Sequence, residues 1–305
     1  MTWFFIALIG PLLYATTNYI DKILLEKYFK QGGVGTILLF SSLFSVVALP
    51  FLFLKDPMVF SVGIKNILIL STVGILNVGV VWCYLIALKH DEASVVIVFY
   101  QLVPIFAYIL GYLILGENLT KLQLIAMALV IFGTTIVSFE IDIDNKFKLR
   151  RKVVLPMLAA AFFWAAGETV FKMVALEENV VRSLFWENLT LAVVGILIFI
   201  FIRKYRENLL LAIKNNSKKI WAFNFLNEAL YVLGNVIFSF VVIMAPVSLV
   251  LLTNSFQPVF VLAIGIFLTV FFKNIASEKI QAKHLWQKIF AICITGIGTY
   301  LLFMK

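Results

Sequence analysis

The chain has 305 residues, of which 63% are hydrophobic and 13% are charged, and its formal net charge is +9. Soluble domains carry about a quarter charged residues and cannot bury this much apolar surface, so a water-soluble globular fold is excluded. The bilayer is therefore the expected solvent for most of the chain. The basic residues lie between apolar runs and form no patch with interleaved aromatic residues, which excludes nucleic acid as the partner.

Apolar runs of about 20 residues, the length that crosses a hydrocarbon core, recur along the chain. They predict ten transmembrane helices, at residues 3–20, 34–54, 66–88, 93–115, 120–139, 153–175, 184–202, 220–244, 246–272 and 284–303. The runs are continuous and do not alternate, which favours helices over the strands of a barrel. The predicted fold class is all-α and integral to the membrane. The first run lacks a basic leader and a cleavage site, so it is expected to be retained as a span.

Lysine and arginine are distributed unequally between the two sets of loops. Of the 25 basic residues, 19 follow odd-numbered spans, within residues 22–30, 89, 146–152, 203–219 and 273–288. Basic loops stay on the cytoplasmic side during insertion, so both termini are expected outside the cell. The expected location is the plasma membrane.

The two halves of the chain resemble each other. Residues 94–106 align without gaps on residues 248–260, and the segment beginning at Tyr14 aligns on the segment beginning at Trp164. Each copy holds five predicted spans, an odd number, so the second copy enters the membrane inverted relative to the first. A site at the interface of such repeats can open alternately to either side, which favours transport.

The predicted units are two inverted five-helix repeats, residues 1–145 and 146–305. In these features the chain resembles the drug/metabolite transporter superfamily, in its ten-helix EamA-like branch, over nearly its whole length. The resemblance rests on the stretch Trp164-Ala-Ala-Gly-Glu168 and its counterpart at Tyr14, the pairs Ser94/Pro104 and Ser248/Pro258, and Leu115-Gly116-Glu117. It implies a transporter and, for the better-known members, termini on the inside, opposite to the orientation that the basic loops favour.

An ionisable side chain at the centre of a span costs roughly 2.5–3.5 kcal/mol, so it usually faces a cavity, pairs with another charge or has a function. Glu168 has Trp164 one turn before it and Lys172 one turn after it, so the three share one helix face. We expect Lys172 to form an ion pair with Glu168, which by itself would be structural. Glu187 lies near the start of its span and is expected to reach the interface or pair with Arg182.

The eighth predicted span has one polar face, which either lines a substrate cavity or makes hydrogen bonds between packed helices. Its residues are Asn224, Asn227, Glu228, Tyr231 and Asn235.

The repeat suggests further candidates. Tyr14 and Asn18 are the equivalents of Trp164 and Glu168, and polar residues precede the prolines of the fourth and ninth spans. The candidate substrate-binding residues are Trp164, Glu168, Glu228, Tyr231, Asn227, Tyr14, Asn18, Tyr100, Gln101, Asn254 and Gln257. On the third span, Asn77, Trp82 and Tyr84 fit helix packing or an interfacial belt better than a cavity.

These residues favour a secondary active transporter of a small polar metabolite such as an amino acid, an amine or a quaternary ammonium ion, because Trp164 and nearby tyrosines suit a cation. Glu168 and Glu228 are expected to face one cavity, with Glu228 as the proton carrier and Glu168 as the substrate anchor, or the reverse. The alternatives are a flippase for a lipid-linked carrier and a non-transporting membrane scaffold. No enzyme chemistry, cofactor or metal site is predicted; a small-molecule substrate and membrane lipid are the expected partners, and the oligomeric state is left open.

Overall fold

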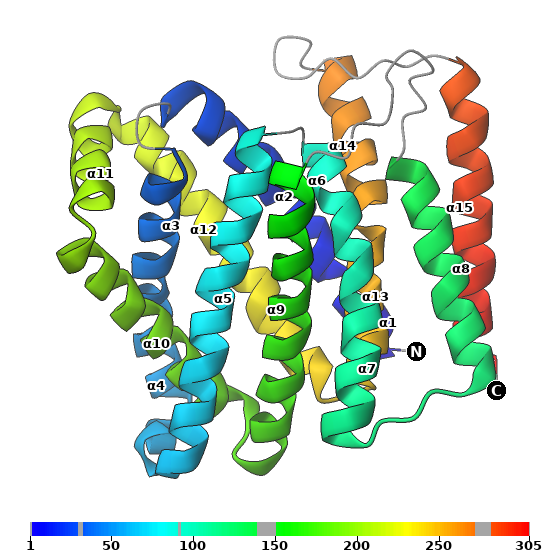
Figure 1. Cartoon of the computed structure of the whole chain (residues 1–305), viewed down its shortest axis with the longest axis horizontal. Helices are drawn as coiled ribbons and strands as arrows, with labels where there is room; N and C mark the ends of the chain where they lie inside the picture. The colour runs from blue at the N-terminus through cyan, green and yellow to red at the C-terminus, as the bar shows by residue number, and fades with distance from the viewer. Residues whose placement is uncertain (1, 30–32, 91–92, 139–150, 272–281, 305) are drawn as a thin grey trace.

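A computed structural model describes residues 2–29, 33–90, 93–138, 151–271 and 282–304, and within these ranges the chain is almost entirely helical, with no strand (Figure 1). This is the backbone conformation that satisfies every N–H and C=O group within one segment in lipid. The basic loop residues around Lys148 and Lys273 lie outside the described residues.

The first half contains α1 (Thr2–Ala7), α2 (Ile9–Ile23), η1 (Leu24–Tyr28), α3 (Gly33–Phe44), η2 (Ser45–Val47), α4 (Ala48–Lys55), η3 (Pro57–Ser61), α5 (Ile64–His90), α6 (Ala93–Val98), η4 (Phe99–Leu102), α7 (Val103–Leu115) and α8 (Lys121–Ser138). The second half contains α9 (Arg151–Glu177), α10 (Val180–Phe201), α11 (Arg203–Asn215), α12 (Lys218–Val242), α13 (Val247–Leu252), η5 (Thr253–Phe256), α14 (Gln257–Phe271) and α15 (Ala282–Leu302).

Eight helical segments among the described residues are long and apolar enough to span a membrane. Two shorter apolar stretches, Lys121–Ile136 and Cys293–Leu302, belong to α8 and α15. Large apolar side chains such as Phe51, Leu54 and Leu113 are 69–76% exposed, as expected for helices that face lipid tails. The chain is therefore a multi-pass membrane protein.

Helices that are related by the sequence similarity run in opposite directions. Figure 1 shows that α2 and α9 are antiparallel, as are α7 and α14. The last helices of the two halves, α8 and α15, are antiparallel too. The two termini lie toward one end of the bundle, whereas α9 and α15 begin at the opposite end.

Two spans contain a short 3-10 segment at related positions. η4 separates α6 from α7, and η5 separates α13 from α14. Pro104 stands at the start of α7 and Pro258 near the start of α14, where a missing N–H removes a hydrogen bond to the preceding turn. The polar residues of η4 and η5 are buried: Tyr100, Gln101, Asn254 and Ser255. The two 3-10 segments therefore hold polar side chains in the interior of the protein.

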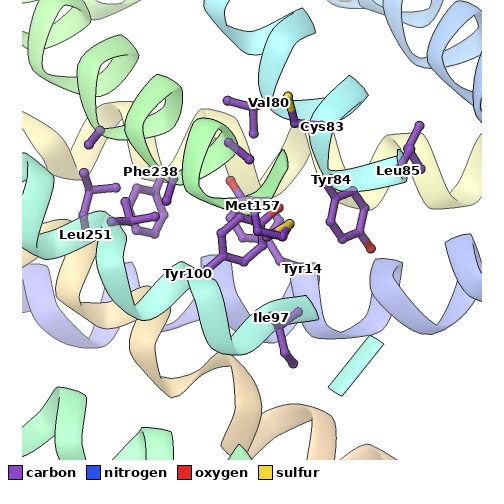
Figure 2. Packing of buried hydrophobic residues seen from close by; sticks show 14 of the residues in the cluster. Tyr14, Val80, Cys83, Tyr84, Leu85, Ile97, Tyr100, Met157, Phe238 and Leu251 are labelled. Atoms are coloured by element: carbon purple, nitrogen blue, oxygen red, sulfur yellow. The ribbon is translucent and has the colours of Figure 1, made fainter. Parts of the chain in front are cut away.

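The main core lies where the two halves meet. Figure 2 shows Tyr14, Tyr84 and Tyr100 among buried side chains that include Met157 and Phe238. Glycine permits this packing at one position, because a Cβ atom on Gly234 would lie 2.8 Å from the Tyr14 ring. The Tyr14 ring therefore rests directly on the backbone of α12.

Candidate functional site

A cavity lies at mid-depth between the two halves of the chain. It includes Asn77 and Trp164, which are the central residues of the 27-residue helices α5 and α9. Its water-accessible volume is about 50 Å³, room for a few water molecules. The lining residues are Tyr14, Thr17, Asn18, Asp21, Asn77, Val80, Val81, Tyr84, Tyr100, Trp164, Tyr231, Asn235 and Gln257.

Aromatic rings from five elements form a cluster around this cavity. The Tyr14 ring centroid lies 5.9 Å from that of Trp164 and 5.6 Å from that of Tyr231. Tyr100 lies 5.0 Å from Trp164 in an edge-to-face arrangement and stacks on Tyr84 at 6.2 Å. Ring faces attract cations within about 6 Å of their centroids, so this cluster suits a small cationic group.

One carboxylate, that of Asp21, lines the same cavity. Its Oδ1 atom accepts a hydrogen bond of 2.7 Å from Asn227 Nδ2, and its Oδ2 atom lies 3.5 Å from the Tyr84 hydroxyl. The Tyr84 hydroxyl also donates to Asn18 Oδ1 at 2.8 Å. The donors that the structure shows for Asp21 are neutral, so a cation in the cavity would meet a carboxylate with no cationic partner among these contacts.

The sequence analysis misses Asp21, because the first span is predicted to end at residue 20. The helix continues through Ile23 and then through η1 to Tyr28. A signal was present: Asp21 follows Asn18 by three residues and Tyr14 by seven, which places all three on one helix face.

Six of the predicted substrate-binding residues line the cavity: Tyr14, Asn18, Tyr100, Trp164, Tyr231 and Gln257. Two third-span residues that the sequence assigned to packing, Asn77 and Tyr84, line it too. Trp82 does not, and its side chain is 45% exposed on the outer surface of α5. Whether these side chains bind a substrate stays a prediction.

The other five predicted residues are buried outside the lining. Asn227 contacts Asp21, as described above, and Glu228 Oε1 accepts a hydrogen bond of 2.5 Å from Ser41 on α3. Gln101 accepts from Thr134 at 3.0 Å and donates to the Ser255 carbonyl at 3.2 Å, which joins η4 to η5. Neither side-chain amide atom of Asn254 has a hydrogen-bond partner.

Glu168 is also buried outside the lining, with its Oε2 atom unpartnered. The expectation for Glu187 is wrong: its side chain is 2% exposed and accepts a hydrogen bond from Asn77, whereas Arg182 forms an ion pair of 2.8 Å with Asp56. The helix α10 begins at Val180, so residue 187 lies two turns inside the helix and faces α5.

Lys172 forms an ion pair, but the expected partner is wrong. Its Nζ atom lies 2.5 Å from Glu117 Oε1 and donates to the Ala245 carbonyl at 2.6 Å. Glu117 Oε2 in turn accepts from the Val247 backbone N–H at 2.7 Å. Gly116, with φ +66°, ends α7 in a left-handed turn and directs Glu117 back toward these partners. We call these four groups the Lys172 cluster.

Between α4 and η3, Asp56 accepts hydrogen bonds from Asn179 at 3.1 Å and from Arg182 at 2.8 Å. The hydrogen bond from Asn179 has the largest effect and that from Arg182 the next; together they hold the pKa of the Asp56 carboxyl below its ordinary value. They connect the loop after α4 to the start of α10. Among the described residues, no three His, Cys, Asp or Glu side chains are grouped in a way that could hold a metal ion.

Residues 1–139 match the EamA-like transporter family. Among solved structures, one crystal structure shares 15% sequence identity with the chain at a TM-score of 0.66, over 99% of this chain and 96% of the other, which indicates a common fold. No curated protein sequence matches the chain.

Proposed function

We propose that the chain belongs to the drug/metabolite transporter superfamily and is a secondary active transporter of a small polar metabolite. The match of residues 1–139 to the EamA-like transporter family supports this proposal. The substrate moves by alternating access, in which the cavity between the halves opens first to one side of the membrane and then to the other. The proposed location is the plasma membrane, with both termini outside.

The proposed architecture is ten spans in two inverted five-helix repeats, residues 1–145 and 146–305. The antiparallel course of α2 and α9, and of α7 and α14, supports the inversion (Figure 1). The 3-10 segments η4 and η5, at related positions of the two halves, support the repeat. The helices α8 and α15 would supply the two spans beyond the eight that are long and apolar enough on their own.

The proposed substrates are amino acids, amines and quaternary ammonium ions. The observation that carries this proposal is a cavity at mid-depth that combines five aromatic rings with the Asp21 carboxylate and receives residues from both halves. Ring faces contribute about 0.5–2 kcal/mol each to cation binding, and the carboxylate supplies the opposite charge. Glu168 and Glu228 remain the proposed groups for proton coupling.

A cavity with room for a few waters is too small for such a substrate, so binding requires the helices around it to separate. A thermal-shift screen of the purified protein against amines, quaternary ammonium ions, amino acids, sugars and lipid-linked sugars tests the proposal. A ligand that binds the folded state raises the unfolding temperature. We expect shifts with cationic or zwitterionic amines. Shifts with lipid-linked sugars alone would favour a flippase, and no shift with any compound would favour a scaffold.

A further inference from the structure

The polar face of α12 continues beyond the cavity toward the beginning of the helix. Tyr231 and Asn235 line the cavity. Toward the N-terminus of α12, Asn227, Asn224 and Trp221 follow at intervals of three or four residues. Residues at this spacing share one helix face, and each interval advances about 5 Å along the helix axis. The face therefore leads from the cavity toward the start of α12, which lies at the end of the bundle opposite the two termini (Figure 1).

This face packs inside the protein, against helices of the first half. The Trp221 ring centroid lies 5.2 Å from that of Phe40 on α3. At the cavity end, Asn227 Nδ2 donates a hydrogen bond of 2.7 Å to the Asp21 carboxylate. Asn224 lies between Trp221 and Asn227 and is 0% exposed, and Asn227 is 2% exposed. The face thus runs between the two halves and meets the cavity at Asp21.

Several buried hydrogen-bonding atoms on this face are unsatisfied. Within the described part of the chain, neither amide atom of Asn224 has a hydrogen-bond partner, and the same holds for Asn227 Oδ1 and for the indole Nε1 of Trp221. On α3, one turn before Phe40, Thr36 is 0% exposed, and its hydroxyl is likewise unpartnered among the residues that the structure describes. These atoms include both donors and acceptors.

Helix packing alone does not account for this arrangement. Polar side chains that hold helices together make their hydrogen bonds within the protein. Gln101 does so, because it joins η4 to η5, and so does the fully buried Thr169 on α9, whose hydroxyl donates to the Ala165 carbonyl at 2.7 Å. A buried water makes about three hydrogen bonds and can both donate and accept, so water suits the mixed set of groups on α12 and α3.

The same groups suit a cation in transit. The Trp221 ring face attracts a cation, and the side-chain oxygens of Asn224 and Asn227 can replace part of its hydration shell. None of these three residues carries a charge, so they offer contacts but no opposite charge. The first carboxylate that joins this face to the cavity is Asp21, through its hydrogen bond from Asn227.

We propose that the α12 face from Trp221 to Asn227, together with Thr36 of α3, is a hydrated access route, and that a cationic substrate follows it to Asp21 from the end of the bundle opposite the termini. The use of the route by a substrate rests on the proposed transport function, whereas its hydration does not. Polar groups along the route lower the cost of bringing a charge to the centre of the membrane.

Cysteine accessibility tests the hydration without any substrate. Asn224→Cys and Phe225→Cys are each made in a background in which Cys83 and Cys293 are replaced by Ala, and the protein in liposomes is treated with the cationic reagent 2-(trimethylammonium)ethyl methanethiosulfonate. Phe225 is the matched control, because it is the next residue on α12 and is 50% exposed on the outer, apolar surface. The thiolate is the reactive form and needs water, so we expect Asn224→Cys to react about tenfold faster or more. Equal rates would overturn the route.

Thr36→Cys is a second reporter that changes the side chain very little, in case Asn224→Cys does not fold. Its control is Thr169→Cys, at an equally buried threonine whose hydroxyl is bonded within its own helix. We expect reaction at residue 36 and almost none at residue 169, and equal rates would again overturn the route. Reaction should be faster when the reagent is on the side opposite an N-terminal tag, and the reverse would contradict the direction of entry.

Asn224→Leu tests the passage of a substrate, because it places an apolar side chain of similar size in the route and leaves the cavity unchanged. Stopped-flow tryptophan fluorescence with tetramethylammonium should show association and dissociation slowed to the same extent, with an unchanged dissociation constant. Unchanged rates, or a change in the dissociation constant alone, would overturn the passage. Reactive cysteines at residues 224 and 36, together with no binding of tetramethylammonium by the wild type, would uphold the hydrated route and contradict the proposed function.

Discussion

The molecule holds charge away from water in two ways, in the Lys172 cluster and at the cavity carboxylate Asp21. In the cluster, Lys172 is 6% exposed and meets both Glu117 and a backbone carbonyl, while Glu117 also accepts a backbone N–H. Each charge has an opposite charge and a second partner. At Asp21, the contacts that the structure shows come from the neutral side chains of Asn227 and Tyr84.

The two regions differ in whether the charge already has an opposite charge within the chain, and only a charge without one is available to bind a ligand. A buried ion pair whose partners are all in the chain is already neutral and needs nothing from outside. A buried carboxylate with neutral neighbours must be completed by a proton or a bound cation. The cluster therefore connects α7 to α9 and to the start of α13, whereas the cavity carboxylate Asp21 is the place where a bound cation would change the charge.

The largest effect is expected when the cluster loses its cation. Lys172→Met leaves the partly buried Glu117 charge without its opposite charge. Removing one partner of a fully buried pair costs about 3–5 kcal/mol, which is the upper bound for this change. Thermal unfolding in detergent should show a large decrease in the unfolding temperature. The double variant Lys172→Met/Glu117→Gln should recover much of the loss, and Lys214→Met on α11 serves as the exposed control. An unchanged unfolding temperature in Lys172→Met would show that the Lys172–Glu117 ion pair contributes nothing to stability.

The carboxylate in the cavity should affect binding more than stability. Asp21→Asn removes the charge but keeps the shape, and a hydrogen bond to a charged group is worth about 1.5–3 kcal/mol, so affinity for a cationic ligand should fall about 10-fold or more. Ligand titration by thermal shift measures this change. Glu26→Gln, at an exposed carboxylate slightly more than one turn away, should bind as the wild type does. Equal affinity in Asp21→Asn would remove Asp21 from the binding site.

A smaller effect is expected from one aromatic ring. Trp164→Ala removes one ring face, worth about 0.5–2 kcal/mol, so the apparent substrate constant should rise about 2- to 30-fold at near-normal protein levels. Trp82→Ala is the matched control, because Trp82 is half-exposed on α5 and outside the cavity. If both variants gave the same transport kinetics, the indole of Trp164 would have no part in binding.

The smallest effect concerns Asp56, whose carboxylate forms a partly buried ion pair with Arg182. The pKa of the Asp56 carboxyl is lower in the folded protein than in the unfolded chain. Its contribution to the free energy of unfolding is therefore present above the unfolded pKa of about 3.9 and is lost as the pH falls through the folded pKa. Asp56→Asn should reduce the difference in unfolding temperature between neutral and acidic pH. Glu207→Gln on α11 is an exposed control, and an identical acid dependence in Asp56→Asn and the wild type would contradict the assignment.

Much of the helical fold was predictable, because each span must be a long apolar run in lipid. The ends of the helices were harder to predict, because charged residues such as Asp21 and Lys22 resemble loop residues in the sequence but lie inside α2. The internal repeat pointed to Tyr14 and Asn18, and helical spacing along the eighth span pointed to Tyr231; the structure places all three in the cavity lining.

Partners that are distant in the sequence could not be predicted in this way. Helical spacing suggested Glu168 for Lys172, but the packing of α7 against α9 brings Glu117, 55 residues away, to the same point. Glu187 shows the same limit, because its partner Asn77 is 110 residues away on α5. Such contacts depend on how helices pack, which no local pattern encodes.

The central claim is that the cavity between the halves is the transport site. Purified protein in liposomes, preloaded with the amine that gives the largest thermal shift, should accumulate the labelled amine by exchange. We predict exchange well above that of empty liposomes for the wild type and close to their background for Asp21→Asn. Exchange by Asp21→Asn at the wild-type rate, or none by the wild type, would contradict the claim.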